Sequence, residues 1–162
     1  MKKEKIIFVS HCILNQYVRK NLRNNLSSKN EILEVLLDSK IGINQLPCPE
    51  IEFNGKANVE FNTNSKEYKE YCKKLSSKIS KTIKKYLKAN FDVVGILGVD
   101  FSPTCAVYRI SDGKRIKFKK GILIEEIEKQ MQKENFQVPI FSVNLNNVLP
   151  TVEKLNLLLK NS

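Results

Sequence analysis

The chain has 162 residues, 41% of them hydrophobic, and carries a net charge of +11 because 28 lysines and arginines outweigh 17 aspartates and glutamates. The length favours one domain with a single core over residues 1–162, and no apolar run approaches the roughly 20 residues of a membrane-spanning helix. Only four of the basic residues are arginines, the residue best suited to phosphate and base contacts, so the charge favours a solvated lysine surface over specific nucleic-acid binding.

The N-terminal residues resemble the start of a signal peptide, because lysines precede the apolar run Ile6-Ile7-Phe8-Val9. The run stops at Ser10, too soon for the roughly 7–15 apolar residues of a signal peptide. We therefore predict that residues 5–10 form the first strand and that the protein is cytoplasmic.

Residues 11–27 are polar and of mixed character, which predicts a loop with a short helix. Ser28 and Glu31 have the spacing of a capping box, and the apolar residues after them predict a helix that ends near Lys40. Residues 41–46 then predict a second strand.

Pro47 prevents the second strand from continuing, since proline donates no hydrogen bond to a neighbouring strand. Residues 50–64 are predicted to be irregular. Within them, Asn54-Gly55 indicates a turn, and the alternating apolar residues of 57–61 indicate an edge strand.

Asn64 is the predicted cap of a long helix, with Glu67 in its first turn. Apolar residues recur along it at spacings of three and four and predict one buried face, which includes Tyr68, Cys72, Leu75, Ile79, Ile83, Tyr86 and Leu87. Nine lysines cover the remainder: Lys66, Lys69, Lys73, Lys74, Lys78, Lys81, Lys84, Lys85 and Lys88. A solvated outer face is the ordinary role of such lysines, and a surface for RNA or for an acidic partner is the alternative.

Residues 92–99 are the most apolar run of the chain and predict a third strand that is buried on both faces, as in parallel sheets. Two alternating segments follow, joined by Asp112-Gly113, which is a strong hairpin signal. We predict that this hairpin forms a flap beside the ends of the strands.

The remainder of the chain continues the alternation of helix and strand. A helix follows Gly121, a fourth strand covers 138–143, and a last helix begins at Pro150 and ends near Leu159. This order predicts an α/β fold, a three-layer sandwich with a Rossmann-like, mostly parallel sheet and helices on both faces.

Three of the four cysteines follow predicted strand ends: Cys12, Cys48 and Cys105. Parallel strands end at one edge of their sheet, where α/β proteins place ligands, so we expect these thiols to share that edge. No C-x-x-C pair is present, so zinc-finger and ferredoxin spacings are absent. A cysteine taken alone more often fills a core than binds a metal, and it is the shared placement after strand ends that makes a ligand role as favoured as a core role for the three together. Cys72 lies on the apolar face of a helix, and we expect it to serve packing.

Three thiolates without an evident fourth ligand leave one position of a metal site open. A 4Fe–4S cluster held this way would keep one iron free as a Lewis acid, and zinc is the alternative. Glu50 is a candidate for proton transfer, and Ser102 for a hydrogen bond into the site. Their ordinary roles are a helix cap or solvated carboxylate and a turn residue, respectively. His11 is adjacent to Cys12, and neighbouring side chains on an extended chain point apart, which disfavours a papain-like pair.

Four segments occur in the order seen in the TudS-like 2-thiouracil desulfurase family, and the chain resembles that family from its first strand to its fourth. The segments are Ser10-His11-Cys12-Ile13-Leu14-Asn15, Gln45-Leu46-Pro47-Cys48-Pro49-Glu50, Ser102-Pro103-Thr104-Cys105 and Gly121-Ile122-Leu123-Ile124-Glu125-Glu126-Ile127. The combination of Cys-Pro-Glu with a distant Ser-Pro-x-Cys is more specific than either alone.

This resemblance implies a 4Fe–4S cluster on Cys12, Cys48 and Cys105, and removal of sulfur from a thiolated pyrimidine without net redox change. It assigns Glu50 to proton transfer and Ser102 to contacts with the substrate or the released hydrosulfide. The implied partner is a small thiolated molecule, with no membrane and with a monomer or homodimer as the assembly. A sample prepared in air could lack the cluster.

The chain also departs from the family pattern. Ala106 replaces a glycine, Thr104 replaces a serine, and the segment 51–55 replaces a stretch rich in glycine and proline. These changes indicate a divergent member and affect the expected substrate more than the expected cluster. The alternative function is a binding module with a metal or cluster and a basic surface for RNA.

Overall fold

A four-stranded parallel sheet forms the centre of the molecule in a computed structural model that describes residues 3–18, 26–55 and 62–160. The strands are β1 (Lys5–Val9), β2 (Gly42–Gln45), β3 (Asp92–Val99) and β6 (Ile140–Val143), in the spatial order β2-β1-β3-β6. All three neighbouring pairs are parallel, so the four strands end at the same edge.

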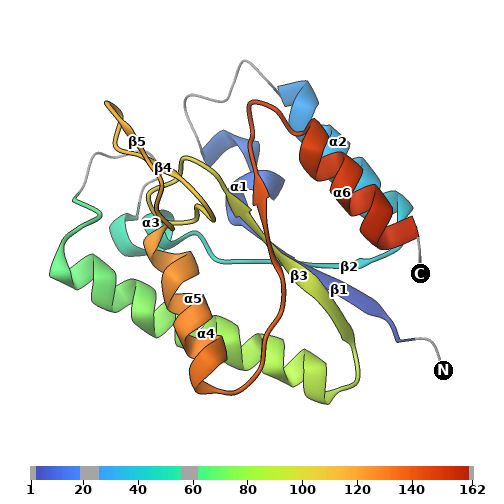
Figure 1. Cartoon of the computed structure of the whole chain (residues 1–162). Helices are drawn as coiled ribbons and strands as arrows, with labels where there is room; N and C mark the ends of the chain where they lie inside the picture. The colour runs from blue at the N-terminus through green and yellow to red at the C-terminus, as the bar shows by residue number, and fades with distance from the viewer. Residues whose placement is uncertain (1–2, 19–25, 56–61, 161–162) are drawn as a thin grey trace.

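Helices cover both faces of this sheet (Figure 1). One face carries α2 (Leu26–Asp38) and α6 (Leu149–Lys160), and the other carries α4 (Lys66–Lys88) and α5 (Ile122–Lys133). The predicted three-layer, Rossmann-like α/β fold is confirmed. Within the described part of the chain, no helix has both the length and the apolar character needed to cross a membrane.

The strand β3 is buried because it lies between β1 and β6 and is covered on both faces. Val94, Leu97 and Val99 contribute to the core beneath α2 and α6, whereas Val93 and Ile96 contribute to the core beneath α4 and α5. An uninterrupted apolar run is what such a position requires, and the predicted bounds of 92–99 are those of the strand.

Short elements surround the carboxyl edge of the sheet. The predicted short helix after β1 is α1 (His11–Leu14), followed by a turn of 3-10 helix (Gln16–Val18). The predicted hairpin is formed by β4 (Ile110–Ser111) and β5 (Ile116–Lys117), which pair antiparallel. Figure 1 shows this hairpin at the same end of the molecule as α1 and α3.

The segment after β2 was expected to be irregular, and this is wrong for its first part. The helix α3 (Pro49–Asn54) starts directly after Cys48 and ends at Gly55, which has φ 71°. Proline in the first turn and glycine after the last turn are favourable helix ends, and the two acidic residues of the first turn complement the helix dipole. The edge strand expected over 57–61 lies outside the described residues.

Several predicted element ends shift by one to three residues. The first long helix, α2, begins at Leu26. Ser28 therefore lies inside its first turn and is not the residue that precedes the helix. The fourth strand begins at Ile140, after Pro139. The last helix begins at Leu149 and keeps Pro150 in its first turn, where the missing N–H has no cost.

The cap of α4 is Ser65 and not Asn64. The hydroxyl of Ser65 accepts a hydrogen bond of 3.2 Å from the backbone N–H of Tyr68, while the N–H of Asn64 donates to the side chain of Asn62 in the preceding turn. Either residue type can cap a helix, and only the path of the incoming chain decides which one does.

We therefore expect Ser65→Ala to lower the free energy of unfolding by about 1 kcal/mol, since the first turn of α4 loses its side-chain acceptor. Asn64→Ala is the matched control and should change it by less than about 0.5 kcal/mol. Urea unfolding followed by circular dichroism measures both variants. A larger effect at Asn64 than at Ser65 would contradict the cap seen here.

Candidate functional site

Three cysteines lie just beyond the carboxyl ends of three adjacent strands. Cys12 is in α1 directly after β1, Cys48 is the N-cap of α3 after β2, and Cys105 lies in the turn that follows β3. Because β2, β1 and β3 are neighbours and parallel, the three segments reach the same edge of the sheet. All three cysteine residues are half-buried.

Hydrogen bonds join the three cysteine segments to one another. Ser10, before Cys12, donates from its hydroxyl to the carbonyl of Leu97 in β3 over 2.7 Å. Nε2 of Gln45, at the end of β2, lies 2.7 Å from Nδ1 of His11. These hydrogen bonds connect the carboxyl ends of β1, β2 and β3 in addition to the pairing of the strands themselves.

The third connection joins the Cys105 turn to α3. The hydroxyl Oγ1 of Thr104 donates to Oε1 of Glu50 over 3.2 Å, and the hydroxyl of Tyr68 in α4 lies 2.9 Å from the same Thr104 oxygen. Glu50 is thus placed between the loops that carry Cys48 and Cys105. Nothing in the sequence pattern indicates this contact, since Thr104 and Glu50 are 54 residues apart.

Ser102 shapes the turn that carries Cys105. Its Oγ accepts hydrogen bonds from the backbone N–H of Cys105 over 3.0 Å and of Thr104 over 3.3 Å, and its side chain is buried. This is the turn role that the sequence left open as the alternative. A hydroxyl that accepts two hydrogen bonds still carries one proton, so Ser102 also retains the capacity to donate to a ligand.

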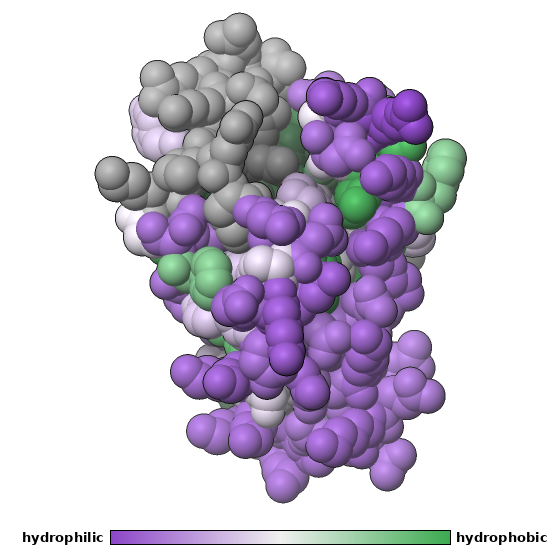
Figure 2. Space-filling view, turned by 90° about the vertical axis from the view of Figure 1, so that its left-hand side faces the viewer, coloured by the Kyte–Doolittle hydropathy of each residue, from purple (hydrophilic) through white to green (hydrophobic). Residues whose placement is uncertain are grey.

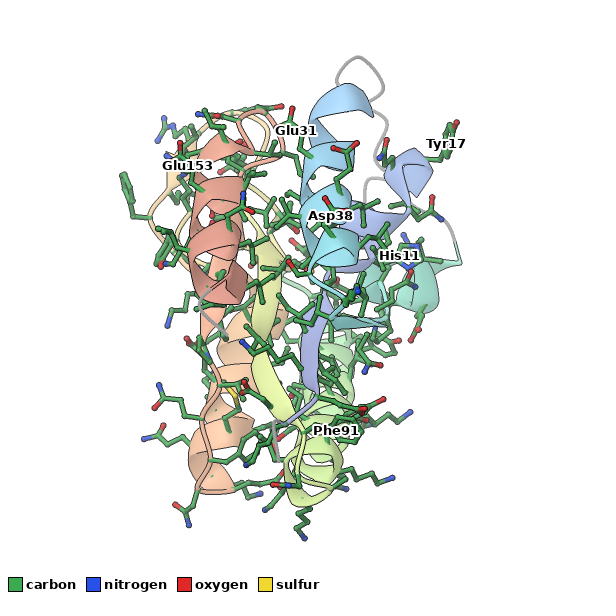
Figure 3. All side chains as sticks on the ribbon, turned by 90° about the vertical axis from the view of Figure 1, so that its right-hand side faces the viewer. His11, Tyr17, Glu31, Asp38, Phe91 and Glu153 are labelled. Atoms are coloured by element: carbon green, nitrogen blue, oxygen red, sulfur yellow. The ribbon has the colours of Figure 1, made fainter. Side chains whose placement is uncertain are left out.

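His11 lies next to Cys12, and its ring is held at the same edge of the sheet by Gln45. Its Nε2 is buried and has no hydrogen-bond partner among the described residues. The Gln45 amide nitrogen can only donate, so Nδ1 accepts and Nε2 carries the ring proton. Figure 3 shows His11 on the side of the molecule that carries α1 and α3.

Burial raises the pKa of the Cys48 thiol, and the nearby charge of Glu50 adds to this effect, while the backbone N–H groups of Ile51 and Glu50 oppose it. Cys72 differs in place and exposure. It lies on the buried face of α4 with 0% of its surface exposed, and burial raises its pKa to about 12 against the opposing hydrogen bond of Tyr68. The expectation that Cys72 serves packing agrees with this position.

These differences predict the pattern of thiol labelling. In the folded protein at pH 8, Cys12, Cys48 and Cys105 should react with an alkylating reagent, while Cys72 should be protected at least about 100-fold because its thiol is both buried and protonated. Mass spectrometry of peptides after timed labelling measures each rate, and labelling in denaturant supplies the unprotected control. Labelling of folded Cys72 as rapid as that of Cys12 would contradict the structure.

The sulfur atoms of the three cysteines are suitable ligands for a soft metal, but the structure does not group them around a metal position. Among the described residues, no three or more histidine, cysteine, aspartate or glutamate side chains form a group that could hold a metal ion. Three partly exposed thiols on linked loops fit a zinc or iron–sulfur site by their chemistry.

A cavity of about 460 Å³ lies beside the Cys105 turn. Pro103, Ile110 and Ser111 line it together with residues 62–64, so the hairpin forms one wall, as expected of a flap beside the strand ends. None of the three cysteines lines this cavity. The candidate site at the ends of β1, β2 and β3 is therefore separate from this cavity.

Comparison with known proteins places the chain in a family. Uncharacterized protein MJ0003 of Methanocaldococcus jannaschii is 36% identical over 166 residues, which cover 96% of this chain and 99% of that protein. The chain belongs to the MJ0003 family. No protein-family model matches the chain, and no solved structure matches it. The name MJ0003 assigns no activity, so the chemistry of this family has to be argued from the site itself.

Proposed function

We propose that the protein is an iron–sulfur-dependent desulfurase that removes sulfur from a thiolated, pyrimidine-like molecule without net redox change. The observation that carries this proposal is the placement of three half-buried cysteines after three adjacent parallel strands. The resemblance of their flanking motifs to the TudS-like desulfurases supports the same reaction and cluster.

Cys12, Cys48 and Cys105 are the residues that would hold a 4Fe–4S cluster, which supplies a Lewis-acidic iron when bound. The overall reaction exchanges the sulfur of a thiocarbonyl for the oxygen of water and releases hydrosulfide, so no electrons are gained or lost. The protein has to orient the substrate, accept a proton from the attacking water and donate a proton to the products.

Glu50 is the group we assign to the proton transfers. It stands next to the Cys48 segment, and Thr104 fixes one of its oxygens, which leaves the other available to water or substrate. Ser102 holds the Cys105 turn in shape through its oxygen and can donate its proton to the substrate or to hydrosulfide. Both residues therefore act on the same edge as the thiols.

Iron and sulfide analysis of protein purified without oxygen tests the proposal. We expect about four irons and four sulfides per chain, a brown colour, and conversion of 2-thiouracil to uracil with release of hydrosulfide. Glu50→Gln should keep the iron and lose turnover. A colourless protein that binds zinc and releases no sulfide from 2-thiouracil would overturn the proposal.

A second candidate function is a module with a metal or cluster that binds RNA through α4. The lysines of α4 other than Lys84 are exposed, whereas Lys84 pairs with Glu134 over 3.1 Å. Figure 2 shows that the face with the start of α4 is mostly hydrophilic. Salt-sensitive RNA binding by a colourless, zinc-loaded protein would favour this function over desulfuration.

A further inference from the structure

We infer that Tyr68, acting through Thr104, is a positioning residue that orients Glu50 and joins the loops of Cys48 and Cys105. The inference rests on the proposed function for the role of Glu50 in catalysis, while the network itself can be tested without any turnover. Tyr68 lies in α4, and the sequence pattern assigned it only to an apolar face.

The direction of the hydrogen bonds follows from counting protons. Thr104 has a single hydroxyl proton and donates it to Oε1 of Glu50 over 3.2 Å. In the hydrogen bond of 2.9 Å between Tyr68 and Thr104, the hydroxyl of Tyr68 must then be the donor. The chain of donors therefore runs from Tyr68 through Thr104 to the carboxylate.

Burial makes this series of hydrogen bonds rigid. Tyr68 is 0% exposed and Thr104 is 1% exposed, so water does not compete for either hydroxyl. Burial also raises the pKa of Tyr68, which keeps its hydroxyl protonated as a donor throughout the ordinary pH range. A buried hydroxyl that lost its partner would carry a large desolvation cost, so the three groups hold one another in place.

The helix α3 is attached to α4 by a second tyrosine, which supplies a matched control. Tyr71 donates from its hydroxyl to Oε2 of Glu52 over 2.6 Å, and the ring of Phe53 packs against the rings of Tyr68 at 5.2 Å and Tyr71 at 5.4 Å. Tyr68 and Tyr71 thus contact α3 from the same helix. Tyr68 is connected to Glu50 by hydrogen bonds through Thr104, whereas Tyr71 is hydrogen-bonded to Glu52.

The first experiment measures the carboxyl carbon resonance of Glu50 by NMR in the full chain before iron loading, at one fixed pH. Tyr68→Phe and Thr104→Val should both move this resonance, because each removes a donor from the chain. Tyr71→Phe should instead move the resonance of Glu52. An unchanged Glu50 resonance in Tyr68→Phe would overturn the inference, whether or not the protein proves to be a desulfurase.

The second experiment measures turnover of 2-thiouracil in the iron-loaded protein. We expect Thr104→Val to lower kcat about tenfold with little change in KM and in iron content, because Glu50 loses its orienting donor. Thr104→Ser keeps the hydroxyl and should stay within about twofold of the wild type, as should Tyr71→Phe. Equal kcat values for Thr104→Val and the wild type would overturn the positioning role, whereas an inactive wild type would overturn the proposed function alone.

Discussion

Replacing Cys12, Cys48 or Cys105 with alanine, one at a time, is expected to abolish iron binding and desulfuration together. Each residue lies after a different strand, so no neighbouring thiol on the same segment can replace a lost one. Loss of a residue that only supports a metal ligand already costs 10–100-fold in affinity or activity, so loss of a ligand should exceed about 100-fold. Iron and sulfide per chain and the rate of hydrosulfide release measure the effect.

Cys72→Ala is the control for these three variants. It removes a thiol of the same chemistry from the buried face of α4, and it should keep its iron while losing about 1 kcal/mol of stability. Loss of iron in Cys72→Ala, or full iron content in any of the other three, would contradict the assignment of the ligands.

The second large effect is expected at Gly121, where α5 meets the Cys105 turn. A Cβ at this position would lie 2.4 Å from the carbonyl carbon and oxygen of Thr104 and 2.6 Å from the backbone nitrogen of Ala106. These neighbours are backbone atoms, which cannot rotate away. Three backbone hydrogen bonds also join the start of α5 to the turn: Gly121 to Ala106, Ile122 to Pro103 and Leu123 to Thr104.

Gly121→Ala should therefore lower the free energy of unfolding by about 3 kcal/mol and reduce iron per chain, because the turn that presents Cys105 is pushed outward. Gly42→Ala provides the control. Its Cβ would meet the side chain of Ile6 at 3.3 Å, which can adjust, so less than about 1 kcal/mol is expected. Urea unfolding and iron analysis measure both, and a Gly121 variant as stable as the wild type would contradict the close contact.

This contact gives a physical reason for one of the motifs that carries the family resemblance. The segment that begins with Gly121 contributes no thiol, yet it packs against the turn from Pro103 to Ala106. We expect the motif to matter because it fixes the position of Cys105. The glycine and the cysteine form one structural unit, although 16 residues separate them in the sequence.

The sequence predicts correctly those elements that depend only on residues close together in the chain. The apolar run of 92–99 could only be a strand covered on both sides, and Asp112-Gly113 could close a tight hairpin wherever the hairpin packed. The cap of α4 was placed one residue early, because Asn64 and Ser65 both have capping side chains. The helix α3 cannot be predicted from periodicity, because six residues are too few to show a helical period.

By itself, the sequence determined the parallel α/β sheet, the succession of its strands and the position of a cysteine after each of three strand ends. These follow from side-chain periodicity and from the residues that end strands, which act over a few positions. The tertiary structure alone decided that Thr104 bonds to Glu50, that Tyr68 supports both, and that Ser102 accepts from the Cys105 turn. The Tyr68 and Glu50 contacts join segments far apart in the chain, and only the packing of α3, α4 and the β3 loop brings their side chains within hydrogen-bond distance.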